Sequence, residues 1–277
     1  MTQPIGIFDS GIGGLSVLKA LRTELPNEYF IYLADSGHAP YGERDDAHVV
    51  DRSLKIAAHL AKQNVKALVV ACNTATAAAI DVLRARYPDL PIIGVEPALK
   101  PAVSLSKTKR IAVMATRSTL GSARFTALLA AQSGQARFEL LPCDGLAEAI
   151  EKSVHQSSAT ELIAACARII GASDLFNIQK ATENSENGAT SVDTLVLGCT
   201  HYPFAAQHIA ALVGTKVQLL DTGDAVARQT ARLAGEQRVH QPPVRPVEFI
   251  STGNPAALRA AAATWLGLQS DVQILSI

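Results

Sequence analysis

The stretch ALVVACNTATAAAIDVLRARY, residues 67–87, joins a short apolar run to a helical pattern rich in alanine. The run expected as a strand, Ala67–Ala71, contains no polar residue, as a strand buried on both faces of a parallel sheet requires. Asn73 and Thr74 favour a helix start directly after it. The stretch is therefore expected to be a β-α unit, with Cys72 at its turn.

The same alternation of short apolar runs and longer Ala- and Leu-rich runs extends along the chain, and it predicts the α/β fold class, with parallel sheets covered by helices. The expected strands are Ile5–Phe8, Tyr29–Ala34, Ala67–Ala71, Ile92–Val95, Ile111–Ala115, Phe138–Leu141, Thr194–Leu197, Val217–Leu220, Val247–Ile250 and Val272–Leu275.

The first eight strands fall into two matching sets of four, judged by the residues at the end of each strand. IFDSG pairs with VMATRS, YLADSG with LLPCDG, LVVACNTA with LVLGCTHY, and IIGVEPA with QLLDTGDA. We therefore expect two pseudo-symmetric doubly wound domains, residues 1–98 plus 220–277 and residues 99–219. Ligands of such sheets bind beyond the carboxyl ends of the strands, which predicts an active site in the interdomain cleft. The polar segment 172–191 is expected to be an inserted surface loop.

Composition narrows the classes of protein and partner. The chain has 277 residues, 48% hydrophobic and 18% charged, which excludes intrinsic disorder. Lys plus Arg and Asp plus Glu number 25 each, so there is no basic field for nucleic acid or an anionic membrane. The N-terminal segment has no secretory pattern, and no apolar run spans a membrane. We expect a cytoplasmic protein, four free thiols and a small-molecule partner.

Two of the four cysteines occupy equivalent positions. Cys72 and Cys199 each follow a strand of the repeat and precede a predicted helix, whose N-terminus would lower the thiol pKa from about 8.5. Two activated thiols facing one cleft suit removal of a proton from one face of a carbon and its return to the other. Burial as small core residues is the alternative for both, and the expected role of Cys143 and Cys166. The cysteine spacings form no metal motif, so no metal is expected.

Polar loops follow the other strands. DSGIGG, starting at Asp9, opens a helix and brings N–H groups to a possible anion, although a tight turn or a solvated capping carboxylate is the alternative. It departs from the dinucleotide fingerprint. Tyr41, between Pro40 and Gly42, offers its backbone to a ligand. His201, two residues after Cys199, is a candidate for proton transfer.

With IGIFDSGIGGLSVL, ADSGHAPYGER, ACNTATA, GVEPALKPA and LGCTHYP in hand, the chain resembles the bacterial glutamate racemases of the cofactor-independent Asp/Glu racemase superfamily over nearly its whole length. The resemblance implies an isomerase without a cofactor that makes D-glutamate for peptidoglycan and cell-wall biogenesis, and a homodimer is the assembly expected from it. An aspartate or other amino-acid racemase, a one-thiol decarboxylase and a non-catalytic amino-acid-binding protein remain as rivals.

The resemblance also implies roles for residues. Cys72 would act on the α-proton of the D-enantiomer, assisted by Asp9, and Cys199 on that of the L-enantiomer, assisted by Glu151 and His201. The implied substrate contacts are Asp9, Ser10, Pro40, Tyr41, Gly42, Asn73, Thr74, Thr116, Thr119, Thr200 and His201. Their hydroxyl and amide groups suit two carboxylates and an ammonium.

Overall fold

The computed structural model describes residues 3–154, 159–173, 175–176, 191–235 and 247–277. Contacts between residues divide the chain into two compact units: unit 1 comprises residues 1–96 and 222–277, and unit 2 residues 97–221. Most of the insertion expected over residues 172–191 lies outside the described residues.

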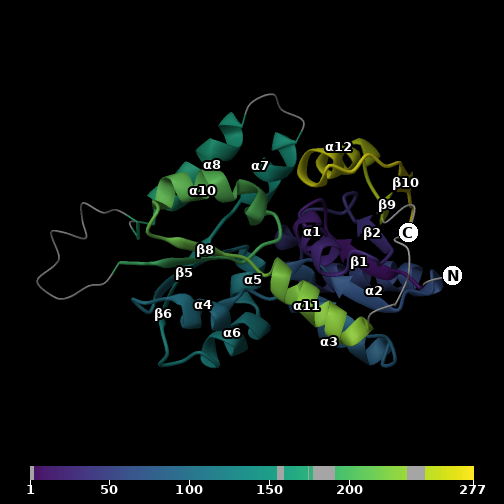
Figure 1. The fold of residues 1–277 in the computed structure, drawn as a ribbon, viewed down its shortest axis with the longest axis horizontal. Coiled ribbons are helices and arrows are strands. Elements are labelled where there is room, and N and C mark those ends of the chain that lie inside the picture. The colour runs from purple at the N-terminus through teal and green to yellow at the C-terminus, as the bar shows by residue number, and fades with distance from the viewer. Residues whose placement is uncertain (1–2, 155–158, 174, 177–190, 236–246) are drawn as a thin grey trace, which may run out of the picture. The chain divides into compact units, whose positions relative to one another are not determined.

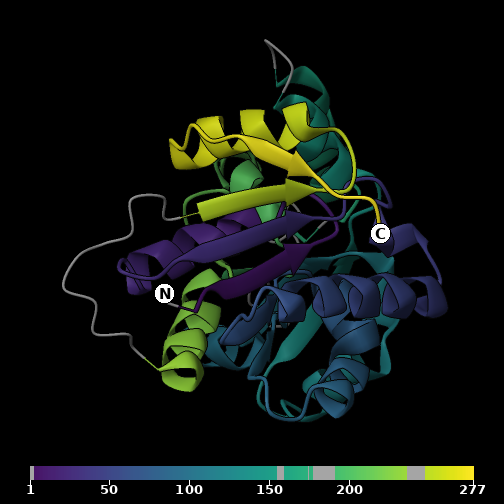
Figure 2. The same cartoon turned by 90° about the vertical axis from the view of Figure 1, so that its right-hand side faces the viewer.

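Unit 1 is built on a six-stranded parallel sheet of order β10-β9-β2-β1-β3-β4. Its strands are β1 (Ile5–Asp9), β2 (Phe30–Ala34), β3 (Ala67–Val70), β4 (Ile92–Gly94), β9 (Val247–Ser251) and β10 (Val272–Ile274). Figure 2 shows β9, β2 and β1 side by side, running in one direction. Every residue of β1, β2 and β3 is buried, and all of them except Asp9 at the end of β1 are apolar, as burial on both faces of a parallel sheet requires.

The helices of unit 1 begin where capping residues stand. They are α1 (Leu15–Glu24), α2 (Asp46–Lys62), α3 (Asn73–Arg86), α11 (Gly223–Ala234) and α12 (Pro255–Leu266), with the 3₁₀ helix η1 (Tyr41–Glu43). Asp45 caps α2 by accepting the N–H of His48 at 2.8 Å, and Asn254 caps α12. Helices α2 and α3 pack together and bury a core that includes Phe8, Ile56 and Leu68.

Unit 2 is built on a four-stranded parallel sheet of order β6-β5-β7-β8. The strands are β5 (Arg110–Ala115), β6 (Arg137–Pro142), β7 (Thr194–Leu197) and β8 (Gln218–Leu220). The helices are α4 (Leu99–Leu105), α5 (Arg117–Gly121), α6 (Ala123–Ala130), α7 (Leu146–Ser153), α8 (Thr160–Gly171) and α10 (Ala206–Val213), with the 3₁₀ helix η3 (Tyr202–Ala205). Within this unit, α7, α8 and α10 lie on one face of the sheet and α4 and α6 on the other (Figure 1).

The fold class predicted from the sequence is confirmed. All ten expected strands are present among the described residues, with ends that differ from the expected ones by one residue at most. The order β2-β1-β3-β4 in unit 1 is repeated as β6-β5-β7-β8 in unit 2, so the matching segments of the two halves occupy equivalent strands. Cys72 and Cys199 therefore follow equivalent strands, β3 and β7.

Candidate active site

The Cys72 thiol lies at the carboxyl end of β3 and caps α3. The residue has extended backbone, φ −141° and ψ 120°, and its Sγ accepts the N–H of Ala75 at 3.4 Å. Only 5% of Cys72 is exposed. The expected position at a helix N-terminus is confirmed, and both this N–H and the dipole of a fourteen-residue helix favour negative charge on the sulfur.

A short chain of hydrogen bonds joins this thiol to Asp9. The Cys72 thiol lies 3.9 Å from Oγ of Ser10, whose hydroxyl is 3.4 Å from Oδ1 of Asp9. The Asp9 carboxylate is fully buried and accepts the N–H groups of Ser10 at 2.8 Å and Gly14 at 2.6 Å. The alternative of a solvated Asp9 is therefore wrong. The Asp9 carboxylate is instead hydrogen-bonded within its own DSGIGG loop, next to Ser10.

Gly14 is required by this arrangement. A Cβ at this position would lie 2.8 Å from Cβ of Asp9, 2.9 Å from Oη of Tyr32 and 3.1 Å from Cβ of Ala71. Because Asp9, Tyr32 and Ala71 are close-packed around this position, neither the backbone nor these side chains can move enough to make room for a methyl group. Glycine thus allows α1 to start close enough for its N–H to bind Asp9.

The other unit 1 residues expected at the site also lie near the carboxyl ends of the strands. Asn73 and Thr74 open α3 and are buried, and Nδ2 of Asn73 donates to the carbonyl of Val95 at 3.4 Å. Tyr41 is also buried, but its phenol donates to Oδ2 of Asp35 at 2.6 Å. The Tyr41 side chain is therefore an anchor for this loop.

In unit 2, Cys199, His201 and Glu151 form a second chain of polar groups. Sγ of Cys199 lies 3.6 Å from Nδ1 of His201, and Nε2 of His201 lies 2.9 Å from Oε1 of Glu151, which α7 supplies. Burial opposes protonation of His201, but its hydrogen bonds to Cys199 and Glu151 outweigh burial and raise its pKa well above the usual value. The imidazolium form places a positive charge beside the thiol.

The local structure around Cys199 differs from the prediction. A continuous helix was expected directly after it, but the chain forms the four-residue 3₁₀ helix η3, preceded by His201, before α10 begins. No side chain caps η3. Cys199 therefore does not repeat the capping geometry of Cys72, and His201 stands at the cap position instead.

Sequence reasoning missed Tyr202 as a neighbour of this thiol. Tyr202 is fully buried, and burial, together with the negative charge of a Cys199 thiolate, raises its pKa well above the usual value. Burial likewise raises the pKa of Cys143 to about 12, and its thiol donates to the carbonyl of Leu141 at 3.2 Å. Cys143 is thus a neutral buried thiol, and its shared environment with Tyr202 depends on packing between β6 and η3 that the sequence does not indicate.

Threonines complete the polar groups at the carboxyl ends of the unit 2 strands. Thr116 follows β5 and caps α5, its hydroxyl accepting the N–H of Thr119 at 3.2 Å and donating to Oγ1 of Thr119 at 3.0 Å. Thr200 is buried beside Cys199 in the chain. In each unit, the predicted residues therefore gather at the end of the sheet where parallel folds bind ligands.

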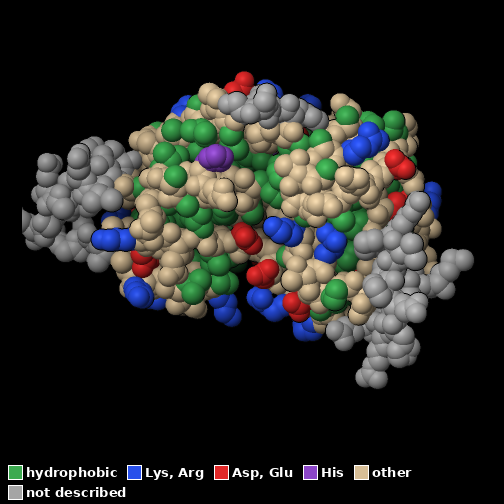
Figure 3. Space-filling view, turned by 45° about the horizontal axis from the view of Figure 1, so that its top comes forward, with side chains coloured by type: hydrophobic (Ala, Val, Ile, Leu, Met, Phe, Trp, Pro, Cys, Tyr) green, Lys and Arg blue, Asp and Glu red, His purple; other side chains and the backbone are tan. Residues whose placement is uncertain are grey.

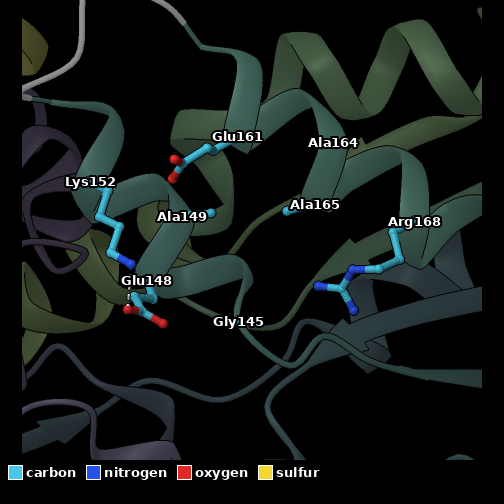
Figure 4. A pocket seen from close by; sticks show the side chains of 8 residues that line it. All are labelled: Gly145, Glu148, Ala149, Lys152, Glu161, Ala164, Ala165 and Arg168. Atoms are coloured by element: carbon cyan, nitrogen blue, oxygen red, sulfur yellow. Dashed lines mark ion pairs between the residues drawn. The ribbon is translucent and has the colours of Figure 1, made fainter.

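A separate cavity of about 360 Å³ lies between α7 and α8 (Figure 4). Glu148 and Lys152 of α7 form an ion pair of 2.8 Å at its rim, and Arg168 projects from α8. None of the site residues predicted from the sequence lines this cavity.

Charged side chains of both signs lie on the surface. Basic and acidic side chains lie interspersed on the face shown in Figure 3. Within the part of the chain that the structure describes, no helix is long and apolar enough to cross a membrane, and no three His, Cys, Asp or Glu residues are grouped as metal ligands.

Comparison with known proteins identifies the family of this chain. A family model for Asp/Glu/Hydantoin racemase matches residues 14–175. The glutamate racemase of Ectopseudomonas mendocina is 44% identical over 272 residues, 98% of this chain and 97% of that protein, and the Ralstonia pickettii enzyme is 46% identical over 95% and 88%.

Solved structures agree. The Escherichia coli glutamate racemase, in complex with L-glutamate and the activator UDP-MurNAc-Ala, has a TM-score of 0.83 at 28% identity, covering 99% of this chain and 98% of that one. The Francisella tularensis enzyme, in complex with D-glutamate, has a TM-score of 0.78 at 27% identity over the same shares. The chain belongs to the Asp/Glu/hydantoin racemase family of isomerases. Within that family its similarity is to the glutamate racemases, so the resemblance seen in the motifs is confirmed.

Proposed function

We propose that this chain interconverts L- and D-glutamate by moving the α-proton between two thiols, Cys72 and Cys199, which act on opposite faces of the bound amino acid. The observation that carries the proposal is the repeated position of the two cysteines. Each follows the equivalent strand of an equivalent parallel sheet, and each sulfur has a polar group beside it, the N–H of Ala75 at Cys72 and the imidazole of His201 at Cys199.

Each turnover moves one proton off the α-carbon and another onto it. From L-glutamate, the Cys199 thiolate takes the proton, and the electron pair of the broken C–H bond is left on the α-carbon and its carboxylate. The neutral Cys72 thiol then gives its proton to the opposite face, which yields D-glutamate. From D-glutamate the same steps run in reverse, with Cys72 as the base.

The neighbours of each thiol support these roles. In unit 1, Ser10 relays between Asp9 and Cys72, so that the buried carboxylate holds the hydroxyl that faces the thiol. In unit 2, the His201 imidazolium stabilises the Cys199 thiolate, and Glu151 keeps His201 protonated. We assign catalytic roles to Cys72, Cys199, Asp9, Glu151 and His201.

An α-proton of an amino acid is weakly acidic, so the site must stabilise the developing carbanion. Exclusion of water strengthens each thiolate as a base, and N–H and O–H dipoles aimed at the substrate carboxylate spread the negative charge. The buried hydroxyl and amide groups of Ser10, Asn73, Thr74, Thr119 and Thr200 supply such dipoles. Under this mechanism the protein's own groups suffice and no cofactor is needed.

We further propose that the product serves peptidoglycan synthesis and that the enzyme acts in the cytoplasm. Assembly into a homodimer stays a prediction from the resemblance.

Incubation of the purified protein with L-glutamate in D₂O tests the proposal. Racemisation requires loss of optical rotation together with incorporation of deuterium at the α-carbon. Retention of both rotation and the α-proton would leave only amino-acid binding. The same assay with L-aspartate separates the two racemase classes, and we expect glutamate to be strongly preferred.

A further inference from the structure

A buried network centred on Asp35 lies directly behind the loop that contains Tyr41. Asp35 follows β2, is fully buried, and its N–H donates to the carbonyl of Asp9 at 2.9 Å. Its carboxylate accepts Nε and Nη2 of Arg52 at 2.9 and 2.8 Å and the phenol of Tyr41 at 2.6 Å. It also accepts the Thr252 hydroxyl at 2.7 Å. Nδ1 of His38 also lies 3.1 Å from Oδ1 of Asp35, so five polar groups from three separate segments converge on one carboxylate.

Two of the three donor residues are nearly as buried as the acceptor. Arg52 is 3% exposed and Tyr41 is 1% exposed. Burial opposes ionisation of Asp35, but the hydrogen bonds from Arg52, Tyr41 and Thr252 outweigh it and lower the pKa of Asp35. Breaking such a buried pair leaves an uncompensated charge, so the arrangement resists distortion.

Thr252 connects the network to the C-terminal strands of the same unit. Its hydroxyl accepts the N–H of Gly37 at 3.2 Å, and its own N–H donates to the carbonyl of Ala34 at 3.0 Å. A Cβ at Gly37 would lie 2.6 Å from the carbonyl oxygen of Thr252. The turn after β2 therefore packs backbone to backbone against the turn after β9.

The Tyr41 ring is fixed on a second side by His48. The two rings meet edge to face, with centroids 6.4 Å apart and an interplanar angle of 89°. With its hydroxyl held by Asp35 and its ring held by His48, Tyr41 has no freedom to turn. The backbone of Pro40–Gly42, at the start of η1, is thereby set in one position.

We propose that Asp35 and Arg52 are positioning residues of the racemase: their ion pair, completed by Thr252, holds Tyr41 and thereby fixes the backbone of Pro40–Gly42, where a substrate carboxylate makes contact. This inference rests on the proposed function, which supplies the substrate. The network itself touches no reacting atom, and it acts through the loop.

The test uses substitutions in the network that keep side-chain volume. Thr252→Val and Tyr41→Phe each remove one donor to Asp35, and Thr252→Ser keeps the hydroxyl. We expect the KM for glutamate to rise about tenfold in Thr252→Val and Tyr41→Phe while kcat changes less, because contact to the carboxylate contributes to binding in both the ground state and the transition state. Thr252→Ser should restore the parent KM.

A second measurement follows the loop without relying on activity. Amide hydrogen exchange of the peptide covering residues 36–44, read by mass spectrometry, should accelerate in Thr252→Val and Tyr41→Phe and stay at the parent rate in Thr252→Ser. The matched control is Glu28→Gln. It removes the buried ion pair between Glu28 and Lys66, 2.7 Å long, which stands before β2 and β3 at the opposite end of the same sheet.

Faster exchange with a raised KM in the network variants, and neither in Glu28→Gln, supports the inference. Unchanged exchange overturns it, as does faster exchange with the parent KM, because the loop would then not serve the substrate. A KM raised equally in Glu28→Gln also overturns it, since any loss of stability would suffice. If the parent protein leaves the α-proton of glutamate in place, the proposed function has failed. Faster loop exchange in the variants would then show only that the Asp35 network holds the loop in place.

Discussion

The carboxyl ends of β3 and β7 hold the same side chain in different ways. Cys72 caps a fourteen-residue helix and accepts a backbone N–H from Ala75. Cys199 precedes a four-residue 3₁₀ helix and instead lies beside the imidazole of His201. Unit 1 therefore stabilises negative charge with backbone dipoles, and unit 2 does so with a titratable side chain.

The difference shows what a duplicated fold conserves. Equivalent strands place the two sulfur atoms, because strand order and register fix the start of each following segment. The environment of each sulfur is then free to change. The partial positive charge of a backbone N–H group does not depend on pH. The full positive charge of an imidazolium is lost when the pH rises through its pKa. The two thiols should thus respond differently to pH and to substitution of their neighbours.

The largest expected effect comes from replacing either thiol. We expect Cys72→Ser and Cys199→Ser each to lower racemisation by about 10²- to 10⁴-fold, since a hydroxyl is a much weaker acid than a thiol. Thermal unfolding should stay near that of the parent. The measurement is optical rotation with both enantiomers as starting material.

Cys166 supplies the matched control. Its thiol is buried in α8, and burial raises its pKa to about 11. Cys166→Ala should therefore keep the parent rate. Parent activity in either Cys72→Ser or Cys199→Ser would contradict the two-thiol mechanism, whatever Cys166→Ala does.

A smaller effect is expected from crowding the carboxylate behind Cys72. In Gly14→Ala the new methyl group would displace Asp9, and with it the Ser10 hydroxyl, so we expect kcat/KM to fall about 10²-fold, as misplacement by roughly 1 Å can cause. The control is Gly121→Ala in α5, where a Cβ meets nothing within 4 Å. Normal activity in Gly14→Ala would mean that Asp9 does not support the thiol.

Local sequence was sufficient to predict the strands and the helix start after Cys72, although the capping residue is Cys72 itself and not Asn73 or Thr74. The central strands are uninterrupted apolar runs, and the Asn73–Thr74 pair directly after β3 marks a helix start in the residues themselves. Prediction was weaker after β7, where Pro203 follows the motif cysteine and the chain forms a 3₁₀ turn before α10. A helical pattern in the sequence does not distinguish these two starts.

Contacts between distant segments could not be predicted. Glu151 reaches His201 across 50 residues of sequence, and only the family resemblance indicated it. Thr252 reaches Asp35 across 217 residues, and Arg52 reaches it from the next helix, so the Asp35 network exists only once the sheet has formed. The turn DSGHAPYGE shows that a polar loop is present but not which buried groups hold it.

The smallest expected effect on activity is that of Glu151→Gln. This substitution tests whether a titratable side chain, His201, supports Cys199. The carboxylate of Glu151 favours protonation of His201, so its neutral replacement should lower the pKa of His201. Turnover of L-glutamate should fall about tenfold at neutral pH. Its loss on the alkaline side should begin at lower pH than in the parent, because Cys199 then loses the imidazolium sooner.

Stability gives the same variant a second readout. Since the pKa of His201 is raised in the folded protein, its contribution to stability is complete below the unfolded value of about 6.5 and is lost as pH rises through the folded value. In Glu151→Gln this loss should be smaller and occur at lower pH. NMR titration of the His201 ring, assigned by its absence in His201→Asn, measures the shift directly. An unaltered titration would mean that Glu151 does not control the charge beside Cys199, and the contrast between backbone and side-chain support would lose its basis.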